Sequence, residues 1–109
     1  MTTFDDREQA FEKKFAHDAE LKFKSEARRN KLLGAWVAGK LGLSGDEAGN
    51  YVKSVVRADL QEPGDEDVFR KIRGDFDDKA IAISDVDIRK AMVEHMEKAI
   101  TEIEAERKA

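Results

Sequence analysis

Hydrophobic residues recur at spacings of three and four along most of this chain, which is the period of amphipathic α-helices. The pattern predicts four helical segments, over about residues 5–41, 44–61, 65–79 and 84–109. Strand patterns are nearly absent, because the one short apolar run, at residues 80–83, is too brief to build a sheet. We therefore expect an all-α fold, a small four-helix bundle with a mobile or protruding N-terminal helical arm.

Capping residues and helix breakers define the expected boundaries. Ser44 and Glu47 have the spacing of a capping box, in which each side chain satisfies a free backbone amide. Pro63 and Gly64 indicate a turn between the second and third segments. Ser84 is placed to cap the fourth helix, whose charged end, residues 102–109, is expected to fray.

The expected core consists of the apolar stripes of these four segments. It includes, among others, Phe23, Trp36, Leu60, Phe69, Ile72 and Phe76. The first segment is much longer than the globular average of about 11 to 12 residues, so one of its ends is expected to project or to be loosely ordered.

Three large apolar residues, Phe4, Phe11 and Phe15, stand in an otherwise charged N-terminal stretch. In one interpretation all three pack onto the bundle. In the other, the stretch is an arm that becomes helical in a groove on a partner, because separations of seven and four place such anchors on one helix face. Spacing alone favours neither interpretation.

Charge changes the picture in two places. Charged residues make up 40% of the 109 residues, against about 25% in an average domain, and the net charge of −4 argues against a nucleic-acid binder. Residues 22–40 nevertheless carry a local excess of +5, and residues 59–79 one of −4. The basic stretch is either a solvated face or a contact for a nucleotide or another anion, with these candidate residues: Lys24, Arg28, Arg29 and Lys31.

Residues for catalysis or metal binding are sparse. The chain has no cysteine, and its two histidines, His17 and His95, are far apart and in no metal-ligand pattern. No glycine-rich phosphate loop occurs, so we expect neither an enzyme nor a cofactor. His17 is either a solvated residue or a pH sensor on the arm. No apolar run approaches the roughly 18 residues of a membrane span, so a cytoplasmic protein without membrane insertion is expected.

Three stretches, residues 4–17, 21–24 and 26–34, resemble the zeta subunit family, the inhibitors of the alphaproteobacterial F-type ATP synthase. The resemblance is most specific over the first forty residues or so. It implies a regulatory protein that inhibits ATP hydrolysis and is peripheral to the inner membrane through the ATP synthase. The implied organisation is an inhibitory arm at residues 1–19 and a four-helix bundle domain at residues 20–109.

The resemblance also implies a mode of action. The arm would enter a catalytic interface between the alpha and beta subunits, near the gamma subunit, and become helical there. Phe4, Phe11 and Phe15 would be buried against the partner. Charged residues would fix the register of the arm: Arg7, Glu8, Lys13 and Lys14. A nucleotide- or anion-binding sensor domain, taking ATP or ADP weakly, stands as the alternative function.

Overall fold

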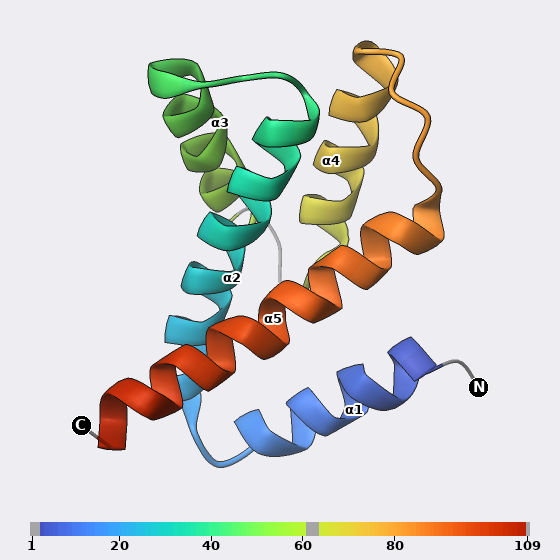
Figure 1. Ribbon diagram of the computed structural model, residues 1–109. Helices are drawn as coiled ribbons and strands as arrows, with labels where there is room; N and C mark the ends of the chain where they lie inside the picture. Colours follow the sequence, from blue (N-terminus) through green and yellow to red (C-terminus); the bar gives the residue numbers. More distant parts are fainter. Residues whose placement is uncertain (1–2, 61–63, 109) are drawn as a thin grey trace.

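The computed structural model describes the backbone of residues 3–60 and 64–108 and the side chains of residues 9–60 and 64–107. Over this part of the chain all regular structure is helical, which confirms the all-α expectation. The helices are α1 (Thr3–Phe15), α2 (Ala19–Lys40), α3 (Gly45–Ala58), α4 (Glu66–Asp78) and α5 (Asp85–Lys108) (Figure 1).

The core forms where α2, α3, α4 and α5 meet. Its buried members come from all four helices: Leu33, Val37, Val55, Val68, Ile72, Phe76, Ile88, Ala91 and Met92. Beyond this cluster, α5 continues along the first half of α2 with further buried residues: Met96, Ala99, Ile100 and Ile103. In Figure 1, α1 lies beside α5 and runs in the same direction.

The expected first helix, residues 5–41, is interrupted, and that prediction was wrong. Residues 16–18 separate α1 from α2, and Asp18 is the N-cap of α2. Its carboxylate accepts a hydrogen bond from the Leu21 amide at 2.8 Å, a local bond that competes with continued helix. Arg107 at the end of α5 also donates to Asp18, at 2.8 Å, so a tertiary contact supports the break.

The other helix ends agree only in part with the boundaries and caps predicted from the sequence. The Ser84 hydroxyl accepts from the Asp87 amide at 3.0 Å, which confirms the cap of α5. Ser44 is at the N-cap of α3, but its side chain makes no capping hydrogen bond, so the predicted capping box is not formed. The predicted fraying of residues 102–109 was also wrong as far as Lys108, and Ala109 lies outside the described residues. α5 stays helical to Lys108, and Arg28 of α2 pairs with Glu106 at 2.8 Å.

The predicted core was right for its centre and wrong at its edges. Ile72 and Phe76 are fully buried, and the half-buried Trp36 meets Phe76 edge-on at 6.1 Å between ring centroids. Leu60 and Phe23 are exposed, at 77% and 71%. Leu60 follows the end of α3. Phe23 stands between the buried Leu21 and Ser25 of α2, about half a turn around the helix from the face that these two share.

Candidate functional site

The candidate site is the N-terminal helix, α1, whose apolar residues share one face. Phe11 and Phe15 are four residues apart, and their rings stack with centroids 6.5 Å apart and planes inclined by 30°. Both side chains are half-buried, whereas Lys13 is exposed. Phe4, Arg7 and Glu8 belong to the same helix, but their side chains lie outside the described part of the structure.

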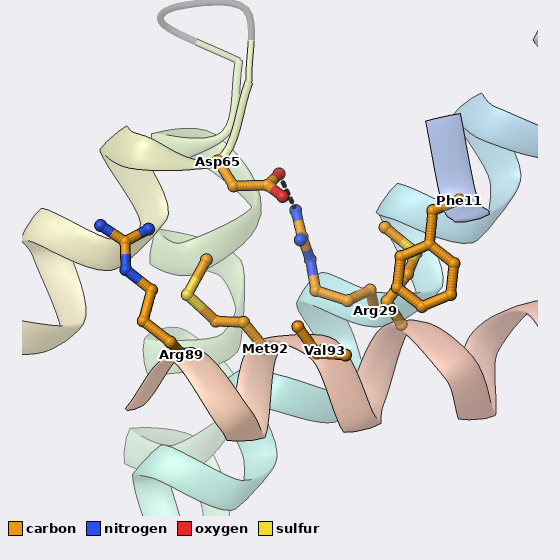
Figure 2. Close-up of a pocket in the computed structure, with 7 residues that line it drawn as sticks. Phe11, Arg29, Asp65, Arg89, Met92 and Val93 are labelled. Carbon is orange, nitrogen blue, oxygen red and sulfur yellow. Dashed lines mark hydrogen bonds and ion pairs between the residues drawn. The ribbon is translucent and has the colours of Figure 1, made fainter. Parts of the chain in front are cut away.

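The apolar face of α1 is turned toward α5. Phe11 borders a small cavity together with Met92, Val93 and Met96, and Figure 2 shows its ring beside Val93. Lys14 forms an ion pair with Glu104, in the last turns of α5. In this structure α1 therefore lies along the bundle instead of protruding from it.

The connection between α1 and α2 is short, and Asp18 attaches it to the end of α5. Asp18 forms an ion pair with Arg107 at 2.8 Å, across 89 positions of sequence. The Arg107 guanidinium, and after it the Leu21 amide, hold the pKa of Asp18 below its usual value. His17 is exposed in the same turn. Residues 16–18 are thus the point about which α1 is oriented relative to α2.

Two of the four basic residues proposed for an anion site, Lys24 and Arg28, are already paired with carboxylates. Lys24 pairs with Glu20 at 2.7 Å on its own helix, and Lys31 is exposed. Arg28 reaches α5, where its hydrogen bond to Glu106 raises the pKa of the guanidinium. At Lys24 and Arg28 an anion would have to displace these carboxylates. Nothing in these contacts tests nucleotide binding, so the nucleotide hypothesis stays a prediction.

Arg29 differs from the other three because its side chain is buried, with 1% exposed. Its guanidinium donates to Asp65 at 3.0 Å and to Asn30 at 2.8 Å, and it lies 3.6 Å from Asp59. Figure 2 shows this side chain between α5 and the start of α4. Arg29 therefore ties α2 to the connection between α3 and α4, which is a structural role.

Sequence reasoning missed the surface that receives α1. The spacing of Met92 and Met96 places both on one face of α5, but spacing within a helix does not reveal which neighbour covers that face. One signal was available in the charges. The acidic run Glu102, Glu104 and Glu106 is complementary to the basic residues near the N-terminus, and it pairs with Lys14 and Arg28.

Within the described residues, no group of three or more histidine, cysteine, aspartate or glutamate side chains has the arrangement of a metal site. The described helices are also too short or too polar to cross a membrane.

A sequence model of the family described as ATPase inhibitor subunit zeta matches residues 1–102. The chain belongs to this family. The match includes all of α1 and the part of α5 as far as Glu102.

The chain also resembles a protein of solved structure. That protein, determined by solution NMR, is 46% identical in sequence, with a TM-score of 0.69 over 79% of this chain and 98% of its own. No curated protein matches the chain. The family description indicates an ATPase inhibitor subunit, and hence a regulatory protein.

Proposed function

We propose that this zeta-family chain inhibits ATP hydrolysis by the F-type ATP synthase, and that α1 is the inhibitory segment. In this proposal α1 enters a catalytic interface between the alpha and beta subunits, near the gamma subunit. The remaining helices hold the segment and raise its local concentration at the enzyme. The protein would then be cytoplasmic and bound to the inner membrane only through the enzyme. The family match over residues 1–102 carries the proposal.

The composition of α1 supports its role as a segment that binds in a groove. α1 has 13 residues, and isolated helices of that length are marginal in water, so an apolar surface is needed to hold it helical. Phe11 and Phe15 supply the anchors on one face. Each contributes about 1.5 to 3 kcal/mol when fully buried. Lys13 is exposed and available for a charge pair that fixes the register on the partner.

A rotary enzyme is inhibited when one rotational state is stabilised over the others. α1 would need only to bind one conformation of the interface more tightly than the rest, because a ligand shifts an equilibrium by its differential affinity. No catalytic group is required of the zeta chain.

The test is ATP hydrolysis by an alphaproteobacterial F-type ATPase from which its own zeta subunit has been removed. The full chain is titrated in parallel with a chain that begins at Glu20 and with the variant Phe15→Ala. We expect inhibition by the full chain, none by the truncated chain, and a roughly tenfold higher half-inhibitory concentration for Phe15→Ala.

Phe23→Ala is the matched control. It removes the same side chain from α2, where Phe23 is 71% exposed and outside the proposed segment. It should inhibit like the native chain. Equal inhibition by the full and truncated chains would move the active surface to helices α2–α5 and reject α1 as the inhibitory segment. The fluorescence of Trp36, the single tryptophan, verifies that each variant is folded.

A further inference from the structure

We propose that α5 is a built-in competitor for α1: the face of α1 that binds the ATPase is the face that docks on α5 in the free protein. The chain then has a docked state, with α1 on α5, and a released state that alone can inhibit. This inference rests on the proposed function, because it concerns how access to the same segment is regulated.

The first observation is that the apolar face of α1 is already occupied. Phe11 is half-buried at the cavity bordered by Met92, Val93 and Met96 of α5 (Figure 2). Phe15, stacked on Phe11, is half-buried as well. One helix face cannot be buried against two surfaces at once, so binding in a groove on a partner requires that α1 leave α5.

The second observation is a pair of polar contacts between the α1 end of the chain and the last turns of α5. Lys14 pairs with Glu104, and Asp18 pairs with Arg107 at 2.8 Å. Both α5 residues are outside the four-helix core, and both contacts hold α1 or its connection in the docked position. The charges of α5 are therefore matched to the segment that it receives.

The third observation is that the docked state is weakly held. Phe11 and Phe15 are only half-buried, and the side chains of Lys14 and Glu104 remain 44% and 35% exposed. Ion pairs with this exposure contribute little. A partner that buries both rings completely therefore binds α1 more strongly than α5 does. The affinity for the partner is reduced in proportion to the fraction of molecules with α1 released.

The decisive variant changes α5 and leaves the sequence of α1 intact. Glu104→Lys places a positive charge opposite Lys14. The matched control is Glu94→Lys, which makes the same change of charge on α5 at an exposed residue whose partner is Lys90 on the same helix, 3.9 Å away. A second variant, Arg107→Gln, removes the contact with Asp18 without reversing a charge.

Two readouts are taken on the full chain. Amide hydrogen exchange without the ATPase measures release of α1 directly, and inhibition of ATP hydrolysis measures its consequence. For Glu104→Lys and Arg107→Gln we expect faster exchange in residues 3–15, unchanged exchange in α3 and α4, and a half-inhibitory concentration lowered roughly two- to fivefold. The control Glu94→Lys should match the native chain in both readouts.

Four results would overturn the competition. Exchange in residues 3–15 that is unaffected by either variant means that these contacts do not hold α1. Faster exchange with unchanged or weaker inhibition means that docking does not compete with the partner. Failure of every chain to inhibit rejects the proposed function, and the competition with it, whatever the exchange shows. Native inhibition that the variants do not improve rejects the competition alone.

Discussion

Arg29 reaches from the middle of α2 to Asp65 at the N-cap of α4, with 3.0 Å between Nη2 and Oδ1. Asp59, which follows α3, lies 3.6 Å from the same guanidinium. One buried cation thus joins three helices, and its removal would leave the partly buried carboxylates of Asp59 and Asp65 without the charge that lies between them.

Arg29→Met should reduce the free energy of unfolding by about 2 to 3 kcal/mol. Breaking a buried pair from one side typically costs about 3 to 5 kcal/mol, but the Asp65 side chain is 43% exposed and regains water. Urea unfolding followed by Trp36 fluorescence measures the loss. Lys31→Met, at an exposed position of the same helix, is the control and should change stability by less than about 0.5 kcal/mol. Equal effects of the two variants would show that the Arg29 contacts are solvated.

Phe76→Ala tests the centre of the core. Phe76 is fully buried and lies 6.1 Å from Trp36, ring centroid to ring centroid. Truncation of a buried phenylalanine costs about 3 to 5 kcal/mol, through lost burial and the cavity left behind. We expect the midpoint of urea unfolding to fall accordingly and the native fluorescence of Trp36 to change. A loss below about 1 kcal/mol would contradict the packing described.

Substitution of two glycines of α2 by alanine should change the free energy of unfolding in opposite directions. A Cβ on Gly34 would stand 3.1 Å from the Cα of Val52, so α2 and α3 would have to move apart, whereas a Cβ on Gly39 meets nothing within 4 Å. Gly34→Ala should lose about 1 kcal/mol, because overpacking outweighs the gain in helix propensity. Gly39→Ala should gain up to about 1 kcal/mol. Thermal unfolding by circular dichroism compares the two, and stabilisation by both would refute a close α2–α3 contact.

Glu26 predicts a pH dependence of stability. Its partial burial, and then the nearby Asp59, raise the pKa of the carboxyl above 4.5. The folded protein therefore binds the proton more tightly than the unfolded chain, and the ionised carboxylate lowers stability at pH values above the folded pKa. Glu26→Gln should raise the melting temperature at pH 7, and the difference should shrink as the pH falls through the folded pKa and vanish below about 4.5.

Glu20→Gln is the control for this pH profile. Lys24 lowers the pKa of Glu20, so the sign is reversed: the stabilisation is present above 4.5 and is lost as the pH falls through the lowered pKa. Glu20→Gln should therefore not stabilise the protein at pH 7. A melting temperature of Glu26→Gln below that of the native chain at pH 7 would contradict the burial of this carboxyl.

The local spacing of apolar residues was sufficient to predict the helical fold and part of the core. The spacing of Ile72 and Phe76 places both on one helix face, and a helix with one apolar face is stable only when that face is covered, so their burial followed from the sequence. The Ser84 cap was equally local, because the hydroxyl and the Asp87 amide are three residues apart. Phe11 and Phe15 could be assigned to one face for the same reason.

The tertiary structure decided what those faces contact. The break before α2 depends on Asp18, whose ion pair with Arg107 spans 89 positions, and no periodicity within residues 5–41 contains that information. The same holds for α1. Its sequence predicts an apolar face, but the spacing of residues does not indicate which surface that face contacts. Only the positions of Val93, Met96 and Glu104 on α5 show that it packs against the bundle. Sequence determined that α1 has something to bury, and the fold determined where it is buried in the free protein.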